Sequence, residues 1–379
     1  MRCETALRVL LADDRPDVLE ALRLLLKAAG HKADTADSPT DVLAAVEARD
    51  YDLILMDLNY ARDTTSGAEG LDLLARFSDM RVAAPVVVMT AWGSIDIAVE
   101  AMRRGACDFV QKPWDNERLL ATLEKQAHLA AGRRATARRD RNEFEIAREV
   151  QQNLFPRSAP QLETLECAGR CVPARAVGGD YYDFLDLGPS ATGLLVADVS
   201  GKGTGAALLM ANLQGCFRSQ IETCGHSPRA MLRAVNRLFC DSTPPEQFAT
   251  AFFARYEDRT RRLQYVNCGH PPPVIVRISG EIERLQPCAT VLGAFRFWEC
   301  EERSAELAPG DALVVFSDGI SEAGIDGGEE FGEFRAIQSI RALDGLSAPA
   351  LAAGLIDAAC RFSPDYQGDD MTVLAARAR

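Results

Sequence analysis

Short, continuously apolar runs alternate with amphipathic segments through the first third of the chain. RVLLAD at Arg8–Asp13, DLILMD at Asp52–Asp57 and PVVVMT at Pro85–Thr90 have the composition of strands buried on both faces. Thinner strands are expected at Lys32–Ala36 and Phe109–Lys112. The segments between them have helical spacing, at Pro16–Ala29, Pro39–Ala48, Gly70–Phe77 and Ser94–Arg104. These β/α repeats predict an α/β unit in which helices cover both faces of a parallel five-stranded sheet.

The next segment is helical from Asn116 to about Phe155. It contains no proline, and the arginines crowded between Arg133 and Arg141 interrupt its apolar stripe. We therefore predict a first folded unit at 6–130, followed by a helical linker at 131–156. The linker is either a solvated connecting helix or a dimeric coiled coil.

The remainder, residues 157–379, is richer in strands. Helices are expected at Thr204–Ile221, Pro228–Phe239 and Ala348–Arg361. Strand-like runs lie at Phe248–Tyr256, Leu263–Asn267, Pro273–Ile278, Glu281–Leu285, Glu302–Leu307, Ala312–Ser317 and Met371–Ala376. Strands with clustered helices predict an α+β domain, a β-sandwich flanked by helices.

Composition narrows the class of protein. A chain of 379 residues with 47% hydrophobic residues suits two folded domains and excludes a disordered chain. The net charge of -13 argues against a nucleic-acid binder. No apolar run approaches the roughly 18 residues of a membrane span, and the N-terminal run is too short for a signal peptide. The 11 cysteines are scattered, as in reduced cytoplasmic proteins, so we expect a soluble, cytoplasmic protein with no membrane partner.

Acidic residues follow two of the predicted parallel strands. Asp13 and Asp14 come directly after one strand, and Asp57 ends another. The carboxyl ends of parallel strands meet at one edge, and crowded carboxylates there favour a bound Mg²⁺. Thr90 and Lys112 end the next strands and offer a hydroxyl and a positive charge to a phosphoryl group. One aspartate alone would be a loop residue or a helix cap. Together these residues predict a phosphoryl-accepting site with Asp57 as nucleophile.

With these residues, the segment 6–130 resembles the flavodoxin-like receiver domain of response regulators. The resemblance implies Asp57 as phosphoacceptor, Asp13, Asp14 and Asp57 as Mg²⁺ ligands, and Thr90, Phe109 and Lys112 as switch and phosphate-contact residues. It also implies a sensor histidine kinase or a phosphotransfer protein as partner. The loop NYARDTTSGAEG at Asn59–Gly70 departs from the family, because it is longer and has no proline. This departure affects the loop geometry and the lifetime of the phosphate.

A second set of acidic residues lies in four separate segments of the C-terminal part. The segments are VGGDYYDF, VADVSGKGTGA, VVFSDGISEA and GDDMTVL, with Asp180, Asp198, Asp318, Asp369 and Asp370. Without a His or Cys pattern nearby, convergence of these carboxylates predicts an all-oxygen site for two Mg²⁺ or Mn²⁺ ions that clamp a phosphate. Asp-Gly turns explain single segments, but not apolar strands that run directly into acids. The run SGKGTGA is too short for a P-loop, so Lys202 is expected on the surface.

These segments resemble, over about 145–379, the metal-dependent serine/threonine protein phosphatases of the bacterial SpoIIE and RsbU type. EIAREVQQNLFP, FATAFFA and NCGHPPP are further matches. The resemblance implies that Asp180 and Asp198 hold the bridging metal pair, that the Val199 carbonyl completes one coordination sphere, and that Asp318 and Asp369, or the adjoining Asp370, hold the other metal. Asn267, His270 and Ser317 are interpreted as structural residues.

The predicted function is a phosphorylation-regulated protein serine/threonine phosphatase of a two-component system. By the resemblance, its substrate is a phosphorylated STAS-type anti-sigma-factor antagonist, and its linker helix transmits the signal and could form a homodimer. The alternative is a catalytically silent adaptor that binds a signalling partner, against which the retained aspartates argue. A DNA-binding regulator would need a helix-turn-helix, and Arg133–Arg141 is the only basic feature.

Overall fold

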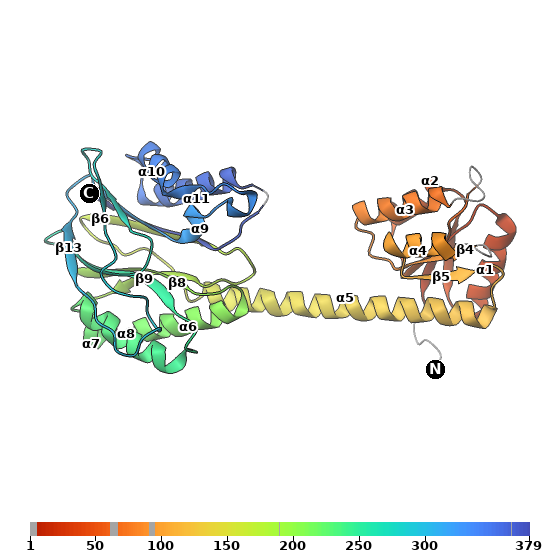
Figure 1. Cartoon of the computed structure of the whole chain (residues 1–379), viewed down its shortest axis with the longest axis horizontal. Helices are drawn as coiled ribbons and strands as arrows, with labels where there is room; N and C mark the ends of the chain where they lie inside the picture. Colours follow the sequence, from red (N-terminus) through yellow and green to blue (C-terminus); the bar gives the residue numbers. More distant parts are fainter. Residues whose placement is uncertain (1–5, 61–66, 91–94, 189, 365) are drawn as a thin grey trace. The chain divides into compact units, whose positions relative to one another are not determined.

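A computed structural model of the chain describes residues 6–60, 67–90, 95–188, 190–364 and 366–379 (Figure 1). It contains two compact units, Met1–Arg141 and Asn142–Arg379, and each is described here by itself. Among the described residues, no helix combines the length and the hydrophobicity that crossing a bilayer requires.

The first unit is a parallel five-stranded sheet in the order β2-β1-β3-β4-β5. Its strands are β1 (Arg8–Ala12), β2 (Lys32–Ala36), β3 (Leu53–Asp57), β4 (Val86–Thr90) and β5 (Asp108–Gln111). Its helices are α1 (Pro16–Ala28), α2 (Pro39–Ala48), α3 (Ala68–Asp79) and α4 (Ile95–Arg103). Every residue of β3 and β4 is buried, and separate apolar clusters cover the two faces of the sheet. The predicted parallel α/β sheet is therefore confirmed.

The ends of these helices follow local chemistry. Ser38 begins α2 by accepting a hydrogen bond from the Asp41 N–H at 3.3 Å, and Pro39 occupies the first turn. Helix α3 extends two residues beyond the predicted segment at each end. Ser94, predicted to begin the fourth helix, and residues 61–66 of the unusual loop lie outside the described residues.

Helix α5 (Asn116–Gln152) is continuous over 37 residues, close to the predicted span. Leu119 and Leu123 near its start pack in the core of the first unit, whereas the arginine-rich stretch is exposed. Leu154, just after its end, packs against the core of the second unit. Because the division between the two units falls inside this helix, the boundaries 6–130, 131–156 and 157–379 stay a prediction.

The second unit contains two antiparallel five-stranded sheets, β13-β10-β9-β8-β7 and β12-β11-β14-β15-β6. The strands are β6 (Leu165–Val172), β7 (Asp180–Asp186), β8 (Ala191–Val199), β9 (Ala249–Glu257), β10 (Arg262–Cys268), β11 (Val274–Val276), β12 (Ile282–Arg284), β13 (Arg303–Glu306), β14 (Ala312–Phe316) and β15 (Met371–Ala378). The helices are α6 (Thr204–Ser219), α7 (Ile221–Cys224), α8 (Pro228–Ser242), α9 (Asp318–Ser321), α10 (Gly332–Ala342) and α11 (Ala348–Phe362), with a 3-10 turn at Ile325–Gly327.

Three apolar clusters define the layers of this unit. One cluster, which includes Val196, Phe252 and Leu374, lies between the two sheets. Another joins α6 and α8 to the outer face of the first sheet, and a third joins α10 and α11 to the second. The predicted β-sandwich flanked by helices is confirmed. Several elements have no predicted counterpart: β6, β7, β8, α7, α9 and α10. Polar residues interrupt β6 and β7, and α7 and α9 are only four residues long.

Candidate functional site

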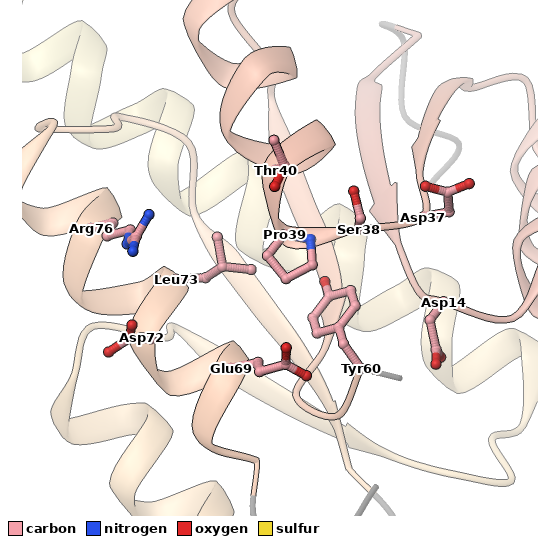
Figure 2. A pocket seen from close by; sticks show the side chains of 10 residues that line it. All are labelled: Asp14, Asp37, Ser38, Pro39, Thr40, Tyr60, Glu69, Asp72, Leu73 and Arg76. Carbon is pink, nitrogen blue, oxygen red and sulfur yellow. The ribbon is translucent and has the colours of Figure 1, made fainter. Parts of the chain in front are cut away.

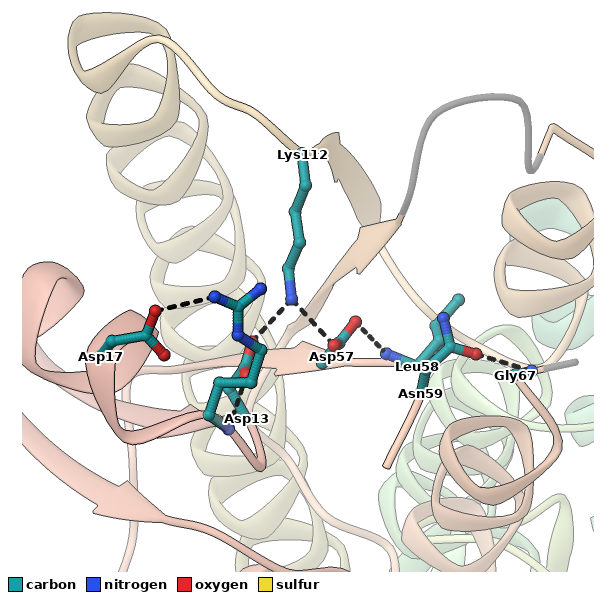
Figure 3. A network of polar contacts seen from close by, with 8 residues as sticks. Asp13, Asp17, Asp57, Leu58, Asn59, Gly67 and Lys112 are labelled. Carbon is teal, nitrogen blue, oxygen red and sulfur yellow. Dashed lines mark hydrogen bonds and ion pairs between the residues drawn. The ribbon is translucent and has the colours of Figure 1, made fainter. Parts of the chain in front are cut away.

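The first acidic cluster lies at the carboxyl edge of the parallel sheet. Carboxylate oxygens of Asp13, Asp14 and Asp57 lie within 4.8 Å of one another, because β1 and β3 are neighbours in the sheet. Lys112, from the loop after β5, reaches between two of them: its Nζ is 2.7 Å from Asp13 Oδ2 and 2.8 Å from Asp57 Oδ2 (Figure 3). Thr90 is buried at the end of β4. The structure thus brings these five predicted residues to one edge.

The charges of this cluster fit one divalent cation. Three carboxylates face one ammonium group, which leaves an excess of negative charge and hard oxygen donors. Burial raises the pKa of Asp57 above its ordinary value, and the hydrogen bond and charge of Lys112 oppose that rise. Phe109, the predicted aromatic switch, is half exposed on β5. The described ends of the unusual loop are joined by a hydrogen bond from the Gly67 N–H to Asn59 Oδ1 (2.9 Å).

The second acidic cluster is assembled from four segments of the sandwich. Asp180 begins β7 and is paired in register with Asp198 on β8. Asp318 begins α9 directly after β14, and Asp369 and Asp370 precede β15, the neighbour of β14. Strand pairing therefore gathers carboxylates that lie up to 190 positions apart in the chain.

The electrostatics of this cluster reflect crowding. Burial and the carboxylates of Asp318, Asp369 and Asp370 raise the pKa of Asp198 to about 7. Burial and the neighbouring Asp198 raise the pKa of Asp180 as well. Within the described part of the chain, Lys202 pairs with Asp369 at the edge of this cluster, and no three of its acids offer oxygens as closely spaced as those of the receiver cluster. Carboxylate oxygens are nevertheless the donors that Mg²⁺ and Mn²⁺ prefer.

The two adjacent aspartates Asp369 and Asp370 make different contacts. The carboxylate of Asp370 is buried and accepts hydrogen bonds from the backbone N–H groups of Ala174 (2.8 Å) and Gly179 (2.7 Å). Asp369 is more exposed, and its Oδ2 lies 2.8 Å from Lys202 Nζ. Asp370 therefore holds the backbone ahead of Asp180, whereas Asp369 accepts from the Asp370 N–H at 2.9 Å and pairs with the half-exposed Lys202.

A glycine turn allows the backbone to approach these acids closely. A Cβ on Gly178 would lie 2.0 Å from Asp370 Oδ2, and one on Gly179 would lie 2.8 Å from the carbonyl oxygen of Val199. This contact places the Val199 carbonyl, a predicted ligand, beside the turn that leads into Asp180. The Oγ of Ser317 is buried and donates to Asp180 Oδ2 at 2.7 Å, as expected of a structural residue next to the site.

Two cationic side chains lie at the rim of the cluster. Lys202 is half exposed, as predicted for a surface residue, but it also pairs with Asp369 and donates to the Gly368 carbonyl at 2.8 Å. Arg175 extends over Gly203, where an added Cβ would lie 3.5 Å from its Nη1. Sequence reasoning missed both contacts, because nothing in the spacing of the motifs links them to the acids.

His270 is a packing residue. It is buried, its Nδ1 lies 3.1 Å from Thr250 Oγ1, and burial lowers its pKa to about 3, so it stays neutral. Asn267 accepts from the His270 N–H at 2.9 Å and donates to the Leu285 carbonyl. These contacts agree with the structural role expected of both residues.

The end of α5 contacts the glycine turn. Gln151 is buried, donates from Nε2 to the Gly178 carbonyl at 2.8 Å and accepts from the Gly178 N–H at 3.1 Å. Phe155 packs against Tyr181 and Tyr182, with ring centroids 5.9 and 5.4 Å apart. The pattern of α5 does not reveal this function of Gln151, since glutamine is common on exposed helices.

Comparisons with known proteins agree with this geometry. Residues 188–379 match the family described as Stage II sporulation protein E (SpoIIE), and residues 9–124 match the response regulator receiver domain. Phosphoserine phosphatase RsbU of Bacillus subtilis is 30% identical over 239 residues, which cover 62% of this chain and 70% of RsbU. The alginate biosynthesis regulator AlgB of Pseudomonas aeruginosa is 34% identical over 191 residues, 49% of this chain and 38% of AlgB.

A solved structure supports the fold of the second unit. The SiaA-PP2C domain of Pseudomonas aeruginosa aligns with a TM-score of 0.57 and 21% identity, covering 64% of this chain and 98% of that domain. At this identity the likeness concerns the fold alone.

Proposed function

Since this chain belongs to the SpoIIE family, it is a protein serine/threonine phosphatase linked to a receiver domain, and we propose that its second acidic cluster is a two-metal active site controlled by phosphorylation of Asp57. The observation that carries the proposal is the crowding of carboxylates from four separate segments, which raises the pKa of Asp198 and Asp180 while Lys202 pairs with Asp369 at the edge.

The proposed ligands are side chains and one carbonyl of this unit. Asp180, Asp198, Asp318, Asp369 and the Val199 carbonyl would hold the two ions. Two bound Mg²⁺ or Mn²⁺ ions would supply Lewis-acid stabilisation of the phosphoryl oxygens and of the attacking water. Asp370 positions the site, because its oxygens are already used by backbone N–H groups.

Other residues of the chain bind and orient the substrate in this proposal. Lys202 presents positive charge at the edge of the cluster, where a phosphate group would enter. Ser317 donates to Asp180 and fixes the orientation of its carboxylate. The water-excluding wall behind the acids is the apolar sandwich core.

We propose phosphoserine or phosphothreonine on a protein as the substrate class. RsbU, the relative that this chain matches over most of its length, is a phosphoserine phosphatase. A phosphorylated STAS-type anti-sigma-factor antagonist is the specific substrate that follows from this likeness. The rival function, a silent adaptor, requires an acidic cluster that persists without catalytic use.

The test is phosphate release from a serine-phosphorylated STAS protein in the presence of Mn²⁺. We expect turnover by the wild type, its loss in Asp198→Asn and its retention in Asp186→Asn, a matched exposed aspartate on β7. Calorimetry should detect three Mn²⁺ sites in the wild type, two in the second acidic cluster and one in the receiver cluster. Partner capture without turnover, and with Mn²⁺ uptake at the receiver site alone, would instead establish the adaptor.

We further propose that α5 carries the phosphorylation signal from a sensor kinase or phosphotransfer protein to the active site. Gln151 at its end holds the glycine turn through two hydrogen bonds. Ile146 and Val150, one turn apart on α5, are 61% and 60% exposed and would pair in a homodimer. Beryllofluoride should change both activity and molecular mass, and Asp57→Asn should abolish both changes. Unchanged values in the wild type would disprove this coupling.

A further inference from the structure

An acidic cleft of about 430 Å³ opens on the receiver unit beside the phosphorylation site (Figure 2). Its walls come from the start of α2, from α3 and from the loops after β1 and β3. Asp14, Asp37, Glu69 and Asp72 line it, and Arg76 is the one cation among its described lining residues. The cleft therefore carries an excess of negative charge that no part of the proposed phosphatase function uses.

A buried hydroxyl in this cleft lacks a partner. Tyr60 is 2% exposed, and among the described residues neither its hydroxyl nor Glu69 Oε2 has a hydrogen-bond partner. Figure 2 shows Tyr60 among the lining side chains, between Glu69 and Asp14. Burial and the surrounding carboxylates raise the pKa of Tyr60, so the hydroxyl keeps its proton. Buried polar groups are nearly always hydrogen-bonded, which indicates a ligand with polar hydrogens at this point.

The arrangement suits an organic cation better than a metal ion. Asp37 precedes α2, whereas Glu69 and Asp72 lie on α3, so these acids stand on different elements around the cleft. These three carboxylates are spread along the walls, and the buried side chains of Tyr60 and Leu73, each 2% exposed, line the cleft with them. A guanidinium group matches this pattern, because it is planar, weakly hydrated, stacks on aromatic rings and donates several hydrogen bonds to carboxylates.

We propose that this cleft binds a guanidinium group, either of a free small molecule or of an arginine side chain on a docked protein. The group donates to Glu69 and Asp72, and the Tyr60 oxygen accepts from it. Since Asp14 lines both the cleft and the predicted magnesium site, occupancy of the cleft bears on the phosphorylation site.

The test is calorimetric titration of the full chain at saturating Mg²⁺ with three probes: agmatine, a blocked arginine-containing tetrapeptide, and butylamine. We expect saturable binding of a guanidinium probe, and butylamine about tenfold weaker. Binding of agmatine alone identifies a free small molecule, whereas equal binding of the tetrapeptide identifies a protein side chain. Absence of saturable guanidinium binding, or equal binding of butylamine, would overturn the proposal.

Variants locate the binding. Glu69→Gln and Asp72→Asn should each weaken it about threefold, and Arg76→Ala should strengthen it by removing a competing cation. Tyr60→Phe, which deletes only the unpartnered hydroxyl, should weaken it too. Asp79→Asn, an exposed aspartate on the same helix outside the cleft, is the matched control. Equal affinities in all variants would place the binding elsewhere. None of these residues belongs to the phosphatase unit, so this outcome is independent of the proposed activity.

Discussion

The two acidic clusters of this chain differ in how a positively charged side chain is placed to neutralise their carboxylates. In the receiver unit, Lys112 lies between Asp13 and Asp57 and is only 22% exposed, so a counter-charge is built into the cluster. In the phosphatase unit, the cation is Lys202 at the rim, 48% exposed and paired with Asp369 alone. There the pKa values of Asp198, Asp180 and Asp318 are raised by burial and by their neighbours.

This difference indicates how the negative charge that is not neutralised within each cluster relates to its proposed function. In the proposed function the receiver cluster, which contains an ammonium group, binds one divalent ion, and Lys112 opposes the rise that burial causes in the pKa of Asp57. The phosphatase cluster, where Lys202 pairs with Asp369 at the edge, is proposed to hold two ions. Asp183, which lies outside both clusters, is a useful contrast. It is fully buried, but its carboxylate accepts hydrogen bonds from Arg218 Nη2 at 2.8 Å, from Arg218 Nε at 3.0 Å and from the Tyr181 hydroxyl. Its charge is satisfied within the protein, which indicates a structural role.

The largest expected effect is on phosphatase turnover, which a substitution in one cluster should lower and a substitution in the other should not. Asp198→Asn should lower phosphatase turnover by at least about 100-fold, because it removes a carboxylate proposed to hold both metals. Asp57→Asn should leave basal turnover unchanged and abolish only its response to beryllofluoride. Hydrolysis of p-nitrophenyl phosphate with Mn²⁺ measures both. Equal losses in the two variants would show that the clusters do not have separate functions.

The next effect distinguishes a satisfied carboxylate from crowded ones. Asp183→Asn should lower the free energy of unfolding by about 3 kcal/mol, because it leaves Arg218 without its buried partner. In chelator, Asp198→Asn should not destabilise the protein, since it relieves repulsion. Urea denaturation measures both, with Asp186→Asn as an exposed control expected to lie within about 0.5 kcal/mol of the wild type. A large decrease in the free energy of unfolding of metal-free Asp198→Asn would contradict the inference that the carboxylates of this cluster repel one another.

A pH dependence should report the same crowding. The pKa of Asp198 is about 7 in the folded protein, against an ordinary value of 3.8. Between these values the folded state holds more protons than the unfolded state, so metal-free stability should fall as pH rises and level off above about pH 7. Thermal melting in chelator should show a decrease on the order of 5 °C, which Asp198→Asn removes. A melting temperature that rises over this window would be inconsistent with the crowded cluster.

The smallest effect concerns the contact between α5 and the active site. Gln151→Ala deletes two hydrogen bonds to Gly178 and should cost about 1 kcal/mol each in stability. It should also reduce the change in activity that beryllofluoride produces. Gln152→Ala, an exposed neighbour, is the control. A full response in Gln151→Ala would show that the signal takes another route.

Prediction from the sequence succeeded where the cause is local. The apolar segments around Leu55 and Val87 form strands that are buried on both faces. An acid that follows such a strand lies at the edge of the sheet, because the strand ends there. The sandwich was predictable from its alternating strands. Several of its elements were not delimited, among them β6, β7, β8 and α10, although β8 is the kind of continuous apolar run that marks a buried strand.

The apolar composition of a strand segment, and the acid that follows it, can both be read from neighbouring positions in the chain. For this reason the sequence alone determined the two fold classes and the two sets of acidic residues. Only the tertiary structure decided which acids remain free. Asp370 accepts a hydrogen bond from the Gly179 N–H, 191 positions away, and Asp183 accepts one from Arg218. Asp369 forms an ion pair with Lys202. These pairings depend on strands that meet after folding, and the spacing of residues along the chain does not record them.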